Sequence, residues 1–135
     1  MTNPTGVTKT KHMKIHVVHS NSYDFKNKLY APLRKSELNK EHQIFLPHET
    51  EEFIKTKELI QNCDVVIAEV SFPATGLGIE LGWADAFNKP IICASKQGSK
   101  VSSSLKAVSE VFVEYSTSEE LIIKLSERLA SYYED

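Results

Sequence analysis

The chain has 135 residues, of which 25% are charged, and its formal net charge at pH 7 is −2. This length suits one domain with a hydrophobic core, and the slightly acidic charge argues against a nucleic-acid-binding surface. No apolar run reaches the length of a membrane span, and the N-terminus lacks the apolar segment of a secretory signal. We therefore expect a soluble cytoplasmic protein that binds neither membrane nor nucleic acid.

The cysteines and histidines give no sign of a disulfide or a metal. Cys63 and Cys93 each adjoin or lie in an apolar run, which predicts two buried thiols. The five histidines show no ligand spacing such as His-x-x-x-His. We expect no metal and no other cofactor.

The first residues differ in character from the rest of the chain. Residues 1–12 are polar, contain Pro4 and Gly6 and have no hydrophobic period, so they predict a mobile N-terminal tail. The domain itself is expected to span 13–135.

The first predicted strand, Lys14–His19, ends at a short polar loop. Short polar side chains favour a turn or a helix cap. A loop after the first strand of an open α/β sheet is also a good place to hold a phosphate, and both interpretations remain open. The loop consists of Ser20, Asn21 and Ser22.

Helical and extended patterns then alternate. Phe25–Leu38 predicts a helix that Pro32 starts or kinks. Gln43–Leu46 predicts the second strand. A further helix is expected to begin at Thr50 and to reach Cys63.

The stretch that follows organises the domain. Asp64–Val70 is short, apolar and β-branched, which is typical of a buried strand. A loop is expected over Ser71–Gly78, then a helix from Ile79 that uses Trp83 on its apolar face. Ile91–Ala94 predicts the next strand, so this stretch forms a right-handed parallel crossover.

Glu80 is the candidate catalytic residue of this crossover. It is expected in the first turn of the helix, where the helix dipole stabilises a carboxylate and keeps it ionised. Ligands of such sheets bind beyond the carboxyl ends of the strands, and an ionised carboxylate there can act as a nucleophile. An acidic residue in a first turn can also have no function beyond stabilising the helix, and this alternative remains open. The glycine spacing fits neither the dinucleotide fingerprint nor the phosphate loop of nucleotide triphosphatases.

The last part of the chain completes the fold. Ser95–Ser104 is a polar loop, Leu105–Val108 a short helix, and Val111–Tyr115 the last strand. Ser118 is expected to cap the final helix. The pattern as a whole predicts an α/β fold: a flavodoxin-like, doubly wound, five-stranded parallel sheet in a single domain.

The stretch DVVIAEVSFPATGLGIELGWADAFNKPIIC resembles the signature of the nucleoside 2-deoxyribosyltransferase superfamily. It is most similar to the branch of 2′-deoxynucleoside 5′-monophosphate N-glycosidases. The shared pattern is Asp-(apolar)-Ala-Glu-Val followed by Gly-x-Gly-x-Glu-Leu-Gly. The resemblance implies cleavage or transfer of the N-glycosidic bond of a 2′-deoxynucleoside or its 5′-monophosphate. In that reaction Glu80 attacks C1′ of the sugar.

The same resemblance implies roles for other residues. His16 stands where the family usually has a tyrosine that orients the glutamate, and is a second catalytic candidate. Ser103 or Ser104 matches a serine that reaches the phosphate in the neighbouring subunit, so a homodimer with shared active sites is implied. The implied substrate-binding residues are Ser20, Asn21, Ser22, Thr75, Gly76, Gly78, Ser103 and Ser104.

Three other hypotheses remain. Thr56 stands where the family has an aspartate that acts on the base, and Ala74 where a serine or aspartate is usual. Together with His16 in place of the tyrosine, these replacements favour a nucleotide-binding module that has lost the chemistry. The loop Ser20–Ser22 is also a weak match to a flavin phosphate loop. The last hypothesis is a scaffold protein without a ligand.

Overall fold

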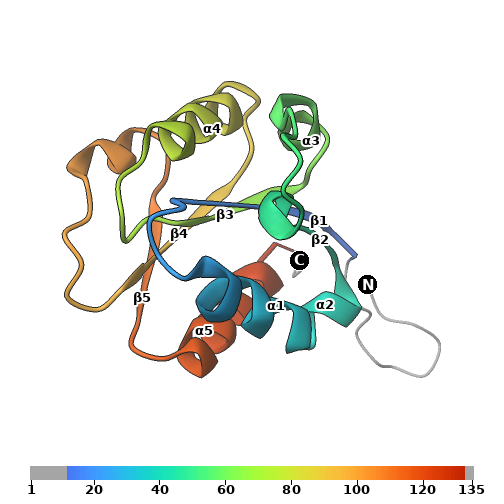
Figure 1. Ribbon diagram of the computed structural model, residues 1–135, viewed down its shortest axis with the longest axis vertical. Helices are drawn as coiled ribbons and strands as arrows, with labels where there is room; N and C mark the ends of the chain where they lie inside the picture. The colour runs from blue at the N-terminus through green and yellow to red at the C-terminus, as the bar shows by residue number, and fades with distance from the viewer. Residues whose placement is uncertain (1–11, 133–135) are drawn as a thin grey trace.

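A computed structural model describes residues 12–132, so nearly all of the predicted tail over residues 1–12 lies outside the described residues. Five parallel strands form one sheet in the order β2-β1-β3-β4-β5 (Figure 1). This confirms the predicted flavodoxin-like α/β fold, because the strand order is that of a doubly wound sheet. The strands are β1 Lys14–His19, β2 Gln43–Phe45, β3 Val65–Glu69, β4 Ile91–Lys96 and β5 Val111–Tyr115.

Helices cover both faces of the sheet (Figure 1). Helices α1 (Ala31–Lys35), α2 (Leu38–Glu41) and α5 (Ser118–Ala130) lie on one face. Helices α3 (Lys57–Gln61) and α4 (Thr75–Ala86) lie on the other. β3 lies inside the sheet between the two helix layers, so all five of its residues are buried, and the first four are apolar.

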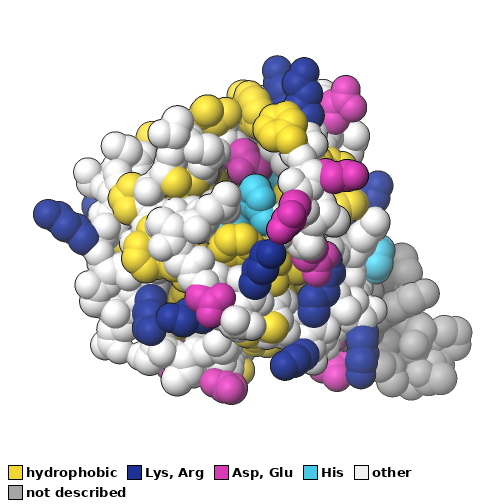
Figure 2. Space-filling model, in the orientation of Figure 1, with side chains coloured by type: hydrophobic (Ala, Val, Ile, Leu, Met, Phe, Trp, Pro, Cys, Tyr) yellow, Lys and Arg dark blue, Asp and Glu magenta, His cyan; other side chains and the backbone are white. Residues whose placement is uncertain are grey.

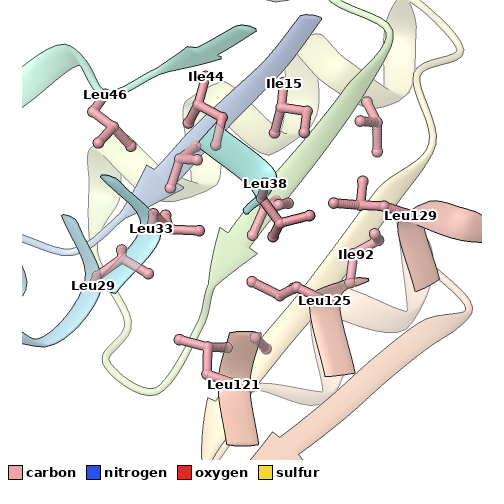
Figure 3. Close-up of a cluster of buried hydrophobic side chains, with 14 of the residues drawn as sticks. Ile15, Leu29, Leu33, Leu38, Ile44, Leu46, Ile92, Leu121, Leu125 and Leu129 are labelled. Carbon is pink, nitrogen blue, oxygen red and sulfur yellow. The ribbon is translucent and has the colours of Figure 1, made fainter. Parts of the chain in front are cut away.

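Two hydrophobic clusters result, one on each face. Figure 3 shows the larger one, in which leucines of α5 and of the segment that includes α1 pack against isoleucines of the sheet. Leu121, Leu125 and Leu129 follow one another at four-residue spacing along α5, and all three are fully buried. The smaller cluster joins Leu77, Leu81 and Ala84 of α4 to the opposite face.

The predicted helix over Phe25–Leu38 is divided in the structure. It opens with a π-helical turn, Lys26–Tyr30, in which Ala31 donates its N–H to the carbonyl of Lys26. Pro32 directly follows this turn and has no N–H to donate to it, so the wider π-helical turn lies where the proline interrupts the regular helical hydrogen bonds. Ser36 is extended and ends α1, and α2 follows as a separate turn.

The prediction of a helix that begins at Thr50 is also wrong over the first half of that segment. A 3₁₀ turn covers Pro47–Glu49, residues 51–56 are irregular, and only α3 is helical. Phe53 is 92% exposed, so it contributes nothing to the core that its spacing suggested. The apolar spacing of this segment therefore does not mark a buried helix face.

Helix α4 begins four residues earlier than predicted, at Thr75, and its N-cap is Ala74. Glycines disfavour helices, but Leu77 packs into the core and stabilises the first turn in spite of Gly76 and Gly78. Glu80 consequently lies in the second turn, and the argument from the helix dipole in the first turn was wrong. The buried face of α4 consists of Leu77, Leu81 and Ala84, whereas Trp83, expected on the apolar face, is only partly buried.

The remaining elements differ only at their ends. Strand β4 extends to Lys96, beyond the predicted Ile91–Ala94. A 3₁₀ helix over Ser103–Ala107 replaces the predicted helix at Leu105–Val108. The cap of α5 is Thr117, not Ser118, because the Thr117 hydroxyl accepts the backbone N–H of Glu120.

Several chemical features of the fold bear on function. Both cysteines are buried free thiols, as predicted, and burial raises the pKa of the Cys63 thiol to about 11. Between residues 12 and 132 no helix is long and apolar enough to cross a membrane. Within the same range, no group of three histidine, cysteine or acidic side chains has a geometry suited to a metal ion.

The packing predicts that alanine substitutions at two nearby positions on α5 have very different effects on the free energy of unfolding. Leu125→Ala removes a fully buried side chain and should lower the free energy of unfolding by about 2–5 kcal/mol. Ile123→Ala is the matched control, because Ile123 is 58% exposed and its loss should change stability little. Urea denaturation of both variants measures the difference, and equal effects would contradict the assignment of the α5 core face.

Candidate functional site

A cavity of about 910 Å³ opens beyond the carboxyl ends of β1 and β3. Open α/β sheets bind ligands at the point where the strand order reverses, and these two neighbouring strands flank that point. Figure 2 shows histidine and acidic side chains together near the centre of one face, close to hydrophobic side chains. The lining combines the end of β1, residues 47–56 and the first turns of α4.

Glu80 lies in this cavity wall and is held by two other elements. The Thr56 hydroxyl donates a hydrogen bond of 2.9 Å to Oε2 of Glu80. Nε2 of His16 lies 3.4 Å from the same oxygen. The Glu80 side chain keeps 18% of its surface exposed, so the carboxylate is fixed but reachable from the cavity.

His16 reaches Glu80 because side chains alternate along β1. Ile15 and Val17 point into the larger hydrophobic cluster, so His16 points toward the face that carries α4. It is completely buried, and Nδ1 has no hydrogen-bond partner among the described residues. Since Nε2 faces a carboxylate oxygen, we assign the hydrogen to Nε2, which leaves a lone pair at the buried Nδ1.

A second histidine, His19, organises the end of β1 next to the cavity. Nδ1 donates to the backbone carbonyl of Ser20 at 2.8 Å, and Nε2 accepts from the Tyr30 hydroxyl at 2.6 Å. The Tyr30 oxygen in turn accepts the backbone N–H of His48 at 3.1 Å. This chain of donors and acceptors joins the Ser20 loop to the Pro47–Glu49 turn on the other side of the cavity.

The two side chains that form these hydrogen bonds, His19 and Tyr30, are both kept neutral. Burial lowers the pKa of His19, and the nearby His48 lowers it further, although the Ser20 carbonyl and Glu80 act in the opposite direction. Burial likewise raises the pKa of Tyr30 well above its ordinary value. A neutral imidazole that accepts from a neutral phenol satisfies every hydrogen-bonding group in the chain.

The Ser20–Ser22 loop is the turn that the sequence suggested. The Ser20 hydroxyl accepts the backbone N–H of Ser22 at 3.1 Å and lies 2.8 Å from the Ser22 hydroxyl. Ser20 is buried, whereas Asn21 and Ser22 are exposed, and all three line the cavity. Their positions are compatible with either of the predicted roles, a turn or a phosphate site.

The structure brings together five of the predicted site residues along the cavity wall: Ser20, Asn21, Ser22, Gly76 and Glu80. A Cβ added at Gly76 would meet nothing within 4 Å, so there is open space beside this residue. His16 lies beneath Glu80 rather than in the wall. The predicted residues that are not part of the cavity wall are Thr75, Gly78, Ser103 and Ser104.

Other cavity residues were not predicted from the sequence. His48 follows the carboxyl end of β2 and is exposed, and its imidazole can donate or accept a proton. Its position after a strand was a usable signal, because this edge of the sheet collects ligand-binding residues. Phe53, Ile79 and Trp83 add an apolar part to the wall. The family resemblance placed position 56 in the site, but nothing in the sequence indicated the hydrogen bond between Thr56 and Glu80, which are 24 positions apart.

A buried carboxylate with its hydrogen-bond donors, the Glu69 cluster, lies at the same edge of the sheet. Glu69, at the end of β3, is 1% exposed. It accepts hydrogen bonds from the backbone N–H and the hydroxyl of Ser71 at 2.7 and 2.9 Å, and from the Tyr115 hydroxyl. The Ser71 hydroxyl also accepts the backbone N–H of Lys96 at 2.8 Å. These bonds fix the loop after β3, which leads into α4 and so positions Glu80.

A family model described as nucleoside 2-deoxyribosyltransferase matches residues 6–121 of the chain. The chain belongs to the nucleoside 2-deoxyribosyltransferase family. This match confirms the resemblance drawn from the motif around Glu80, and it covers most of the domain. The family match and the parallel sheet therefore agree on the same fold.

Individual relatives are similar over shorter segments. The chain is 58% identical over 36 residues to human 5-hydroxymethyl-dUMP N-hydrolase and 49% identical over 45 residues to the rat protein of that name. These segments span 27% and 32% of this chain, but only 21% and 28% of the two relatives. A solved CMP N-glycosidase from Clostridium botulinum has a TM-score of 0.61 and 24% identity, and the alignment covers 84% of this chain and 98% of that one. This likeness supports the fold.

The neutral histidine at the cavity predicts a loss of stability in acid. Because the folded-state pKa of His19 is below the ordinary value of 6.5, the unfolded chain takes up a proton first as the pH falls. The free energy of unfolding should therefore decline from pH 6.5 downward, until the folded protein is itself protonated. The same direction applies to His42, whose pKa is lowered mainly by burial.

Urea denaturation between pH 7.5 and 5 measures this decline. His19→Gln should flatten the decline, and the part that remains should come from the other buried histidine, His42. A stability that is constant over this range would contradict the neutral assignment of His19.

Proposed function

We propose that this protein hydrolyses the N-glycosidic bond of a 2′-deoxynucleoside 5′-monophosphate, with Glu80 as the nucleophile. The observation that supports it most is the position of Glu80. Its carboxylate lies in the wall of a cavity at the switch point of the sheet and receives hydrogen bonds from Thr56 and His16. Family membership and the names of the relatives support the reaction class.

The reaction has two steps. A lone pair of the Glu80 carboxylate forms a bond to C1′ as the C1′–N bond breaks, and the electron pair of that bond leaves with the base. The negative carboxylate stabilises the oxocarbenium-like transition state. Water then attacks C1′ as the C1′–O bond to Glu80 breaks, the carboxylate is regenerated, and the proton of the water passes to the His48 imidazole that gave up its own in the first step. His48 is exposed in the cavity, so its imidazole can supply a proton to the departing base.

The cavity suggests one orientation of the substrate. The 5′-phosphate occupies the Ser20–Ser22 loop, and the sugar lies over Glu80 and the open space beside Gly76. The base points toward the apolar wall. Aromatic side chains bind the face of a nucleobase by stacking, and Phe53 and Trp83 supply them.

The alternative of a binding module without chemistry rested on the replacements at His16, Thr56 and Ala74. Both His16 and Thr56 contact the Glu80 carboxylate, so their presence does not deprive it of hydrogen-bond donors. Ala74 lines the cavity and is the N-cap of α4, and it contributes no side-chain cap. We therefore favour the enzyme.

We also propose a homodimer. Ser103 and Ser104 are exposed and are not part of the cavity wall of this chain. A role in phosphate binding therefore requires that they approach the cavity of a second copy. Sedimentation of the wild type should reveal a dimer at micromolar concentration, and a strictly monomeric protein with full activity would argue against the shared site.

Base release from a panel of 2′-deoxynucleoside 5′-monophosphates tests the reaction. The wild type should release free base, and Glu80→Gln should lower kcat by a factor on the order of 10³ because the nucleophile is lost. Glu58→Gln, which changes an exposed acid on α3, is the matched control and should remain active. A panel without any released base would refute the proposal, as would an active Glu80→Gln.

The phosphate site predicts a discrimination between nucleotide and nucleoside. Ser20→Ala should raise KM for the monophosphate by roughly tenfold, because one hydrogen bond to a charged group is lost. The same variant should leave the kinetics of the corresponding 2′-deoxynucleoside unchanged. Steady-state assays with both substrates measure this, and an equal effect on both would assign Ser20 to the turn alone.

A further inference from the structure

We infer that Thr56 is a positioning residue, whose hydroxyl holds Oε2 of Glu80 and leaves Oε1 as the oxygen that attacks C1′. This inference rests on the proposed function for the identity of the reaction. The geometry behind it does not, because the contact between Thr56 and Glu80 belongs to the protein without substrate.

The first observation is that both donors select one oxygen. The Thr56 hydroxyl and Nε2 of His16 both lie at Oε2, at 2.9 and 3.4 Å. Oε1 of Glu80 receives no hydrogen bond from the described residues. A carboxylate oxygen that accepts two hydrogen bonds has fewer lone pairs available for attack, so the reactive oxygen is Oε1.

The second observation is that Thr56 occupies a helix-cap position without acting as a cap. It is the N-cap residue of α3, where a threonine hydroxyl ordinarily accepts a backbone N–H of the first turn. In this protein Thr56 makes no such bond, and its hydroxyl donates to Glu80. The hydroxyl is therefore directed at the site and not used for local helix stability.

The third observation concerns the strength and rigidity of the two contacts. The contact of Thr56 is within the normal range for an O–H donor, whereas that of His16 is longer than a typical N–H···O bond. Threonine is β-branched and has few side-chain rotamers, so its hydroxyl stays where the backbone of residue 56 places it. Thr56 is thus the main constraint on the Glu80 carboxylate, and His16 the secondary one.

The chemistry also favours a hydroxyl at this place. A threonine donates to Glu80 at every pH at which the protein is folded, because its hydroxyl does not titrate in that range. A carboxylate at the same distance from Oε2 would repel an ionised Glu80, and the pair would then share one proton. Thr56 avoids that competition, so no ionisation of residue 56 should appear in the pH dependence of kcat.

Kinetics of three variants test the inference. Thr56→Val keeps the shape and removes the donor, so kcat should fall by about 10- to 100-fold with little change in KM. Thr56→Ser keeps the hydroxyl and should restore kcat to within a few-fold of the wild type. Thr56→Asp should introduce a new ionisation into the pH dependence of kcat. The inference is overturned if Val and Ser behave alike, or if the loss appears in KM instead of kcat.

Crystal structures of the same proteins without substrate separate this inference from the proposed function. In the wild type and Thr56→Ser, Oε2 of Glu80 should lie within hydrogen-bond distance of residue 56, and in Thr56→Val the carboxylate should leave that position. An unmoved carboxylate in Thr56→Val overturns the inference, whatever the activity. If the wild type releases no base but the carboxylate moves as expected, the reaction is wrong and the positioning role stands.

Discussion

The structure of the site depends on one constraint, the attachment of the Glu80 carboxylate to groups from two other elements. His16 comes from β1 and Thr56 from the start of α3, while Glu80 itself belongs to α4. Because β1 and β3 are neighbours in a parallel sheet, these elements meet at one edge. The carboxylate is fixed before any substrate arrives, which is how preorganised groups contribute most to catalysis. The flanking Glu69 cluster secures the loop that leads into α4.

Most of the fold follows from the sequence for physical reasons. Strands buried on both faces need unbroken apolar runs, and Val65–Glu69 and Ile91–Lys96 lie at two such runs. The errors arise where tertiary contacts override local preference. Two glycines near the start of α4 predicted a loop, but the packing of Leu77 makes them helical. Phe53 has helical spacing, yet it lies at the cavity and not in the core.

The candidate site was predictable in part. Glu80 and the Ser20–Ser22 loop carry local signals, because the loop directly follows β1 and Glu80 lies in the helix that follows β3. The role of Thr56 carries none, since its partner lies far along the chain and its residue type only appeared to remove an acid. Read as a departure from the family, Thr56 suggested lost chemistry. In the structure its hydroxyl donates a hydrogen bond to the nucleophile candidate, so position 56 has a role in the site without a carboxylate.

If Glu80 forms a covalent bond to the sugar, mass spectrometry after a rapid acid quench should detect that bond. The protein is mixed with a 2′-deoxynucleoside 5′-monophosphate that it cleaves, quenched within one turnover, and digested. The peptide that contains Glu80 should carry an adduct of 2-deoxyribose 5-phosphate. Base release with no adduct at any quench time, or with an adduct on another residue, would contradict it.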